Sequence, residues 1–531
     1  MSDDAMLPEM DEDTPEEGAT GTARFIAVGG GRGGVGKSLI AVNLAVYFAQ
    51  LGKNTVLVDA DGAGANLHSH FGLKAAWTEA DRSVGIAEAM RRGLVKTSVP
   101  GLLLLPAAHD ALTPGLPLRA GRKTRWLSAL RELAADYVVV DAGPGHSDLA
   151  LDLCLTADVA VAVTVPEPPA IETTYRFVRA AFRRRLRRAF ARDKLRSSML
   201  ERALASLGPL PAPIQLVHRL AKFDPALADA AWLEAQALRI QLVVNQTRVR
   251  QDPELGAWMS GLVSRHYGVA LDELGHIEHD DTVWLTVRRN KPLLVDSPTT
   301  KSARNVERIA RRVLALATAK PGERTTPVPA PTEEPTLYAV LGVTRSASDE
   351  EIRRAYKRQR EIYATGGLAT VSVLDGDQLA AAQRKLDEAY DTLLDPVRRR
   401  AYDLSTFPTA EPDGVLSART SRPAIAAEQL MLQRDLQREI GPDTEFTGSL
   451  LRKVRESLGM EIAEIAARTK IARAHLEAIE EERYPELPAL VYTRGFLGEL
   501  AKQLRLDPMQ VQKTYLRRFR EDLAARGKEL G

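Results

Sequence analysis

Residues 25–44 read FIAVGGGRGGVGKSLIAVNL, an apolar run that breaks into glycines and then resumes with helical spacing. The glycine-rich part fits the pattern G-x4-G-K-[ST] at Gly31, Gly36, Lys37 and Ser38. Glycines let backbone N–H groups turn inward on a triphosphate, Lys37 reaches its β- and γ-oxygens, and the Ser38 hydroxyl ligates Mg²⁺. A simple turn would not need the flanking strand and helix. The stretch therefore predicts a phosphate-binding loop.

Length and composition indicate an ordinary globular protein. The 531 residues are too many for one core and correspond to about three domains of the usual size. The formal net charge of +2 gives no global field that would attract nucleic acid or membrane. The single cysteine, Cys154, excludes an internal disulfide and fits a reducing compartment.

The chain carries no pattern of an exported or membrane-spanning protein. Its first residues are acidic, the reverse of a signal peptide, and the longest apolar run, 157–165, is too short to cross a bilayer. We therefore expect a cytoplasmic location, with peripheral contact to membrane or nucleoid left open.

Composition shifts divide the chain into candidate domains and connecting segments. We expect a disordered acidic tail at 1–22, an α/β domain at 23–319, a proline-rich linker at 320–335, a helical domain at 336–405, a linker at 406–446 with a candidate amphipathic helix at 424–440, a second helical domain at 447–523 and a tail at 524–531.

The α/β domain is predicted from alternating patterns. Apolar β-branched runs occur at 25–28, 55–58, 101–105, 137–140, 159–165 and 240–244, and helical patterns separate them. This alternation is typical of a mostly parallel sheet with helices on both faces. The predicted fold class is therefore α/β, followed by two small all-α domains.

The segment Arg32-Gly33-Gly34-Val35-Gly36-Lys37-Ser38 resembles the deviant Walker A loop of the MinD/ParA ATPases. Further family motifs follow in order: VLVDADG at 56–62, DYVVVDAGPG at 136–145, VTVPEPPAIE at 163–172 and LVVNQTR at 242–248. The resemblance covers residues 24–319 and lies closest to the FlhG/FleN and MinD branches. It implies a P-loop fold, ATP and Mg²⁺ as ligands, and a dimer that forms when ATP binds.

The resemblance also assigns residue roles. Nucleotide contacts fall to Gly31, Gly33, Gly34, Val35, Gly36, Lys37, Ser38, Leu39, Gly143 and Asn245, the last at the adenine; Mg²⁺ contacts fall to Ser38, Asp59 and Asp141; Lys37, Asp61 and Arg32 are the catalytic candidates. Asp61 would orient the attacking water. Arg32 stands where the family has a lysine that reaches the partner's phosphates.

Plainer interpretations remain for these polar residues. Asp59 and Asp61 also suit turns or helix caps, and Asp141 could simply end a strand. Asn245 could be a solvated residue after a strand. The arginine at position 32 is always charged and binds phosphate bidentately, but its reach differs from that of lysine.

Residues 176–196 carry ten Arg or Lys against one Asp, with Phe182, Leu186 and Phe190 at helical spacing beneath them. Such a surface could bind non-specific DNA, ribosomal RNA or anionic membrane. With equal weight, it could be a packed helix with a solvated outer face.

Residues 336–405 resemble a J domain through Tyr338, Leu341-Gly342-Val343, Asp395-Pro396 and Tyr402-Asp403. The His-Pro-Asp tripeptide of that family is missing, and Tyr363-Ala364-Thr365-Gly366-Gly367 stands in its place. The resemblance therefore implies the fold without co-chaperone activity. The basic face at 353–358 suits an acidic partner or a solvated helix.

Residues 447–523 resemble the helix-turn-helix domain of RodZ through Thr469-Lys470-Ile471, Leu487-Pro488 and Tyr492-x-Arg494-Gly495-Phe496. The segment expected to read DNA carries Glu477, Glu480, Glu481 and Glu482, whose charge repels phosphate, so we favour a protein partner. Glutamate can accept a bond from cytosine, which keeps DNA open. The closing helix 511–523 either completes this core or binds membrane, and we favour the core.

Together these patterns predict a slow, partner-stimulated ATPase of MinD/ParA type that dimerises with ATP. Its helical domains would carry adaptor contacts that position division, motility, flagellar or DNA-partitioning machinery. Two alternatives remain: a DNA-binding transcriptional regulator whose helix-turn-helix is tuned by the ATPase, and a scaffold that binds nucleotide without turnover.

Overall fold

The computed structural model describes residues 23–61, 64, 66–74, 85–106, 120–319, 335–407 and 444–529, the last range without 459, 470, 489 and 505. The predicted acidic tail at 1–22, nearly all of the proline-rich linker and the candidate helix at 424–440 lie outside these residues. Among the described helices, none combines the length and apolarity needed to cross a bilayer.

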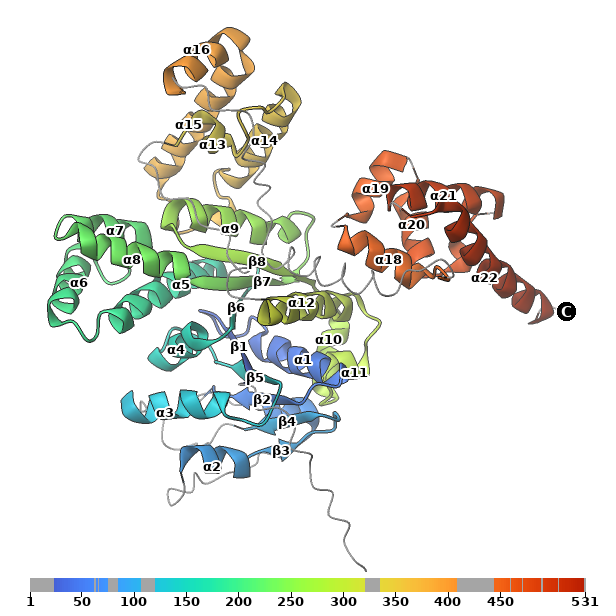
Figure 1. The fold of residues 1–531 in the computed structure, drawn as a ribbon, viewed down its shortest axis with the longest axis horizontal. Coiled ribbons are helices and arrows are strands. Elements are labelled where there is room, and N and C mark those ends of the chain that lie inside the picture. The colour runs from blue at the N-terminus through green and yellow to red at the C-terminus, as the bar shows by residue number, and fades with distance from the viewer. Residues whose placement is uncertain are drawn as a thin grey trace, which may run out of the picture.

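Within the described residues, one sheet of eight strands forms the centre of the sheet domain, residues 23–319 (Figure 1). The strands are β1 (Arg24–Gly29), β2 (Thr55–Asp59), β3 (Val95–Lys96), β4 (Leu102–Leu105), β5 (Tyr137–Asp141), β6 (Val159–Thr164), β7 (Arg239–Thr247) and β8 (Ala270–Glu278). Their order is β3-β4-β2-β5-β1-β6-β7-β8, and all neighbours are parallel except β3 and β4. The predicted α/β class is confirmed, and each predicted run lies on a strand. β3 and β8 are additions.

Helices cover both faces of this sheet because successive side chains of each strand point to opposite sides. One face packs against α1 (Lys37–Gln50), the short helix η1 (Leu67–Phe71), α11 (Leu293–Asp296) and α12 (Lys301–Thr318), with α10 (Asp281–Arg288) beside them. The other face packs against α2 (Ile86–Arg92), α3 (Ala120–Arg131), α4 (Asp148–Thr156), α5 (Pro168–Ala189) and α9 (Asp252–Tyr267). On β1, Phe25 faces this second core and Ile26 the first.

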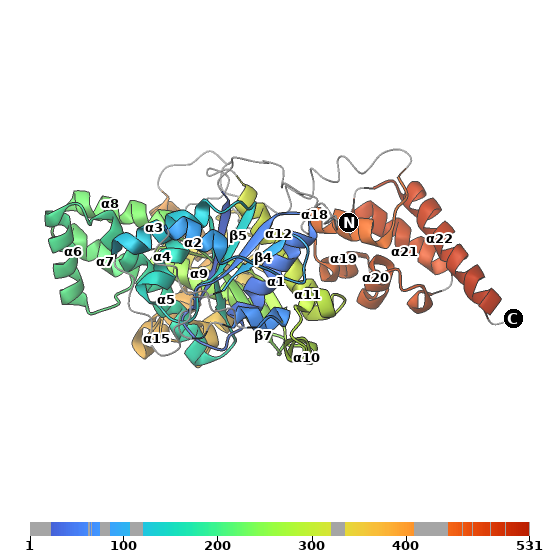
Figure 2. The same ribbon diagram turned by 90° about the horizontal axis from the view of Figure 1, so that it is seen from below.

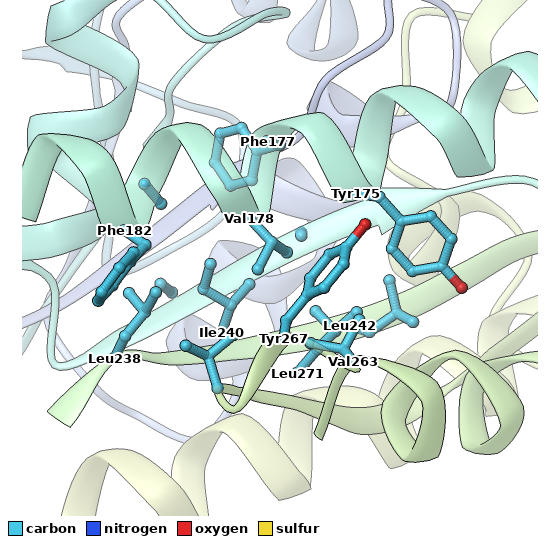
Figure 3. Close-up of a cluster of buried hydrophobic side chains, with 14 of the residues drawn as sticks. Tyr175, Phe177, Val178, Phe182, Leu238, Ile240, Leu242, Val263, Tyr267 and Leu271 are labelled. Atoms are coloured by element: carbon cyan, nitrogen blue, oxygen red, sulfur yellow. The ribbon is translucent and has the colours of Figure 1, made fainter. Parts of the chain in front are cut away.

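The arginine-rich segment forms most of α5, which extends into α6 (Lys194–Leu207), α7 (Pro213–Ala221) and α8 (Pro225–Ala237). Phe177, Val178 and Phe182 of α5 lie in the core beside β7 and α9 (Figure 3). Acidic side chains of other helices pair with its arginines: Arg184 with Asp148 and Asp152, Arg185 with Glu234, and Arg187 with Glu201. The packed-helix alternative therefore describes this segment. The sequence left both alternatives open because the acids come from other helices.

A four-helix module, residues 335–407, contains α13 (Leu337–Leu341), α14 (Asp349–Ile362), η2 (Leu368–Thr370), α15 (Gly376–Leu394) and α16 (Pro396–Thr406). It lies against α9 and α5 (Figure 1). The buried hydroxyl of Tyr175 donates to the carbonyl of Ala369 at 2.6 Å. Tyr363 accepts a bond from Arg265 at 3.1 Å and lies 3.2 Å from the His266 ring nitrogen. Tyr363, which begins the segment 363–367, is thus part of an internal contact.

A five-helix module, residues 444–529, contains α18 (Gly448–Ser457), α19 (Ile462–Thr469), α20 (Arg473–Glu480), η3 (Tyr484–Glu486), α21 (Leu490–Gln503) and α22 (Pro508–Glu529). It has its own hydrophobic core. Val511, Tyr515 and Phe519 of the closing helix are buried there, as the core interpretation predicted. The predicted tail at 524–531 was wrong in its start, because α22 continues to Glu529. The module lies beside α12 (Figures 1 and 2).

Candidate nucleotide site

The glycine-rich loop joins the buried strand β1 to α1 at the carboxyl edge of the sheet. Gly36 caps α1 with φ of 94°, and a β-carbon there would collide with the Asn245 amide. A β-carbon on Gly31 would collide with the Thr173 backbone carbonyl. The space beside Gly34 is open within 4 Å, and Gly33 is exposed. The loop therefore needs glycine for its own packing and leaves its outer side free.

Lys37 begins α1 and is buried. Its Nζ donates to the Arg32 carbonyl at 2.7 Å, so the ammonium group lies inside the curve of the loop. Burial lowers the pKa of Lys37, although Asp141 and Asp61 oppose this shift. A phosphate group in the loop would give this ammonium group the counter-charge that it lacks. Ser38 and Leu39 follow in the first turn of the same helix and are half-buried.

Asp59 and Asp141 end neighbouring parallel strands and lie opposite each other in register. Asp59 accepts bonds from the backbone N–H of Leu67 and of Asp61, each at 3.2 Å. Burial, with a smaller contribution from Asp141, raises the pKa of Asp59 to about 7. Burial also raises the pKa of Asp141, against hydrogen bonds from Ser38 and Gly143. The structure thus brings together three of the predicted oxygen ligands.

These three residues fit Mg²⁺ by their chemistry. Carboxylate and hydroxyl oxygens are its preferred protein ligands. Burial disfavours the charged forms of Asp59 and Asp141, and a bound cation would offset that cost. Within the described ranges, no three His, Cys, Asp or Glu side chains are grouped to hold a metal. Mg²⁺ is usually held by one or two carboxylates together with phosphate and water.

Asp61 lies beside the loop that follows β5. Its Oδ1 accepts a bond from the backbone N–H of Gly64 at 3.0 Å. A β-carbon on Gly143, which has φ of 71°, would lie 2.9 Å from the Asp61 carboxyl carbon. The Gly145 N–H in turn donates to the Gly30 carbonyl at 3.0 Å. Asp61 and Gly143 therefore meet next to the phosphate loop; the catalytic role of Asp61 and the nucleotide contact of Gly143 remain predictions.

Arg32 forms an ion pair with Glu167 at 2.6 Å, and both side chains are largely exposed. The sequence interpretation had not assigned a role to Glu167. One signal was available: Glu167 follows β6, and a parallel sheet places the end of β6 next to the end of β1. The Arg32 guanidinium group, which the resemblance assigns to the phosphates of a second protomer, is therefore paired here with Glu167 of its own chain.

Asn245 lies behind the loop. Its Nδ2 donates to the Val35 carbonyl at 2.8 Å, and its Oδ1 accepts from the Gln246 N–H at 2.9 Å. The side chain is buried, so the solvated alternative for Asn245 was wrong. Its observed contacts hold the phosphate loop, and the predicted adenine contact stays a prediction.

A sequence profile described as NUBPL iron-transfer P-loop NTPase matches residues 21–186. The chromosome-partitioning ATPase Soj of Thermus thermophilus is 37% identical over 174 residues, which cover 31% of this chain and 66% of Soj. The sheet domain is a ParA/MinD-family P-loop NTPase domain. In the C-terminal part, a helix-turn-helix profile matches residues 450–511 of the five-helix module.

Other relatives of this NTPase domain carry different names. An iron–sulfur cluster carrier protein of Aquifex aeolicus is 34% identical over 28% of this chain and 42% of its own length. The antiactivator FleN of Pseudomonas aeruginosa is 30% identical over 30% of this chain and 58% of its own length. The chain thus spans about two fifths to two thirds of the curated relatives that it matches. A MinD structure of Pyrococcus horikoshii with Mg-ADP aligns over 56% of this chain and 98% of that chain, at 20% identity and a TM-score of 0.38.

Proposed function

We propose that the protein is an ATPase of MinD/ParA type, which binds and hydrolyses ATP with Mg²⁺ and dimerises in the ATP state to position cellular machinery. One observation carries the proposal most: Lys37, Asp59, Asp61 and Asp141 meet around an open glycine loop at the carboxyl edge of the sheet. Crevices at this edge are where open α/β sheets bind ligands. The helical modules would carry the adaptor contacts.

The proposed chemistry follows from the positions of charge. Backbone N–H groups of the loop and the Lys37 ammonium group bind the phosphates and offset the charge that develops on them. The Asp61 carboxylate orients a water in line with the terminal phosphate. Mg²⁺, when bound through Ser38 and the two strand-end carboxylates, neutralises phosphate charge.

The proposed dimer depends on Arg32. To reach a partner's phosphates, its guanidinium group has to leave Glu167, and a phosphate offers it a bidentate contact of higher charge in exchange. Both side chains are exposed, so the exchange needs no buried rearrangement. Slow hydrolysis without a partner would follow if the pair with Glu167 persists after ATP binds.

The test is a pair of substitutions with a control. We expect Lys37→Ala to abolish retention of ATP, and Arg32→Ala to retain ATP while remaining monomeric in light scattering. Lys53→Ala, which removes an exposed lysine beyond the end of α1, should behave as wild type. Full ATP-dependent dimerisation of Arg32→Ala would remove the role of Arg32. Failure of the unmodified protein to retain ATP with Mg²⁺ would refute the whole proposal.

Iron–sulfur transfer is not part of the proposal for this chain. Cluster carriers need accessible thiolates, and the single cysteine, Cys154, is buried on α4. Burial raises the pKa of its thiol to about 12. The DNA-regulator alternative is not favoured either. Glu480 and Glu481 of the five-helix module bond to arginines of this chain, so those arginines are not available to DNA phosphates.

A further inference from the structure

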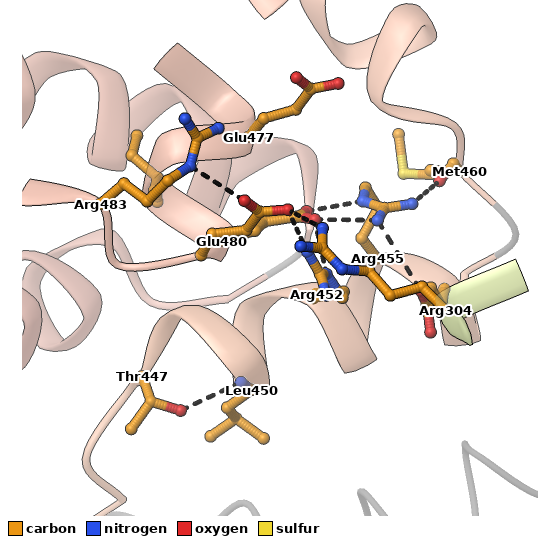
Figure 4. Close-up of polar contacts among 12 residues, drawn as sticks. Arg304, Thr447, Leu450, Arg452, Arg455, Met460, Glu477, Glu480 and Arg483 are labelled. Carbon is orange, nitrogen blue, oxygen red and sulfur yellow. Dashed lines mark hydrogen bonds and ion pairs between the residues drawn. The ribbon is translucent and has the colours of Figure 1, made fainter. Parts of the chain in front are cut away.

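The five-helix module contains a carboxylate that is fixed by its own arginine. Glu480, at the end of α20, is buried and accepts two bonds from Arg455 of α18, at 2.6 and 2.9 Å (Figure 4). Arg455 also donates to the Met460 carbonyl at 2.8 Å. Glu480, one of the four glutamates of the segment expected to read DNA, therefore does not lie on the surface. This bidentate pair instead locks the end of α20 against α18.

The next carboxylate is held in position and points out of the module. Glu481 accepts bonds from Arg452 at 3.2 Å and from Arg483 at 2.9 Å. The same Glu481 accepts a bond from Arg304 of α12 at 2.6 Å. Arg452 and Arg483 of the module thus orient Glu481 for a third guanidinium group, that of Arg304 in the NTPase domain.

A second contact lies two helical turns further along α12. Arg311 donates to Glu456, the acid next to Arg455 on α18, at 2.9 Å. Seven residues separate Arg304 and Arg311, so at about 1.5 Å per residue they lie about 10 Å apart on one side of the helix. Burial lowers the pKa of Arg308, which lies between them, while Glu456 and Glu461 of the module oppose this shift. The arginines of α12 therefore face acids of the module at both ends.

We propose that the five-helix module is a receptor for an arginine-bearing helix face, and that α12 of the same chain is its ligand. The chemical class of the ligand is a pair of guanidinium groups two turns apart on a helix. DNA does not fit this site, because Glu456 and Glu481 would repel phosphate and both acids are bonded to arginine.

This assignment gives the helix-turn-helix fold a protein-binding role within its own chain. An outside partner that uses the same acids has to displace α12. The first turn of α12 is itself tied to the loop after β8, because Ser302 donates to Asp280 at 3.1 Å. Through α12, the five-helix module is thereby attached to the carboxyl edge of the sheet, where the candidate nucleotide site lies. The assignment does not rest on ATP hydrolysis.

The test is a charge swap in the full chain. Arg311→Glu and Glu456→Arg should each release the module, which we would see as a larger radius of gyration in X-ray scattering and faster hydrogen exchange in α18. We expect each single reversal to shift the docking equilibrium by at least about tenfold. The double variant Arg311→Glu/Glu456→Arg should restore docking, because the pair is re-formed with opposite polarity. Arg304→Glu provides a second single reversal at the other end of the contact, with Glu481 kept because Arg452 and Arg483 also bond to it.

Controls separate docking from folding. Arg353→Glu, on the exposed face of α14, should leave scattering unchanged, and each variant should keep the melting temperature of the five-helix module. Unchanged scattering and exchange in both single reversals would overturn the proposal. So would a swapped pair that docks no better than its single variants. Sequence-specific binding of duplex DNA by the wild-type chain, lost in Glu456→Arg, would overturn it as well.

Discussion

The two helical modules attach to the same NTPase domain through different chemistry. The four-helix module uses a buried aromatic contact, in which Tyr175 donates to Ala369 and Tyr363 packs near His266. The five-helix module uses ion pairs of α12 arginines with Glu456 and Glu481. Buried aromatic contacts depend on shape and dehydration, whereas half-exposed ion pairs depend on ionic strength. We therefore expect ionic strength to open the second junction and to leave the first one closed.

Tyr175→Ala should have the largest effect, because this ring is fully buried at the junction with the four-helix module. Loss of such a ring leaves a cavity in the core and costs about 3–5 kcal/mol of the free energy of unfolding. Urea titration of the NTPase domain measures it. Tyr175→Phe keeps the ring and loses only the bond to Ala369, so its cost should be about 1 kcal/mol. Equal costs for both variants would show that the packing contributes little.

Glu480→Ala should come next, and its effect should stay within the five-helix module. Removing this acid leaves Arg455 buried without its partner, which costs about 3–5 kcal/mol in comparable buried pairs. Differential scanning calorimetry should therefore show a lower melting transition for the module alone. ATP retention by the NTPase domain should be unchanged. Glu477→Ala, which removes a partly exposed pair with Arg473 on the same helix, is the matched control.

Much of the NTPase domain could be predicted from its sequence because the signals are local. Glycines in the loop, β-branched runs and acids at strand ends each act within a few residues. Since parallel strands end at one edge, Asp59 and Asp141 had to meet near Lys37. In contrast, β8 was missed because its Asp272 and Glu273 suggest an exposed segment, yet the strand is buried at the end of the sheet.

The sequence could not reveal which charges meet across the fold. Arg184 pairs with acids 32 and 36 residues away, and Arg311 with an acid 145 residues away. No spacing rule connects such partners, so the sequence could not decide between a binding surface and a packed helix for the arginine-rich α5. The junction at Tyr363 was hidden for the same reason. Only the folded chain shows that Tyr363 faces α9.

A smaller effect is expected from pH at the four-helix junction. Burial, and then the charge of the adjacent Arg265, lower the pKa of His266 to about 4. The neutral ring is therefore favoured when the module is docked, and the facing group from the module is the Tyr363 hydroxyl. The contribution is complete above the ordinary histidine pKa of about 6.5 and is lost as pH falls toward 4. After correction for the intrinsic pH dependence of amide exchange, the protection factors of α13 and η2 should fall between pH 6.5 and 4.5, and His266→Gln should remove that fall.

The smallest expected effect is that of ionic strength, which should loosen the five-helix junction and leave the four-helix junction unchanged. Each partly exposed ion pair of α12 is worth about 0.5–1 kcal/mol, and salt near 1 M screens charges beyond about 3 Å. Raising NaCl from about 0.05 to 1 M should therefore increase exchange in α18 while exchange in η2 stays constant. Sodium sulfate at equal ionic strength is an informative control, since it strengthens apolar burial while it screens charge. If both junctions loosen together with salt, the contrast between them is wrong, because the four-helix junction depends on the buried Tyr175 ring and on bonds from Arg265 to neutral acceptors, which salt weakens less than ion pairs.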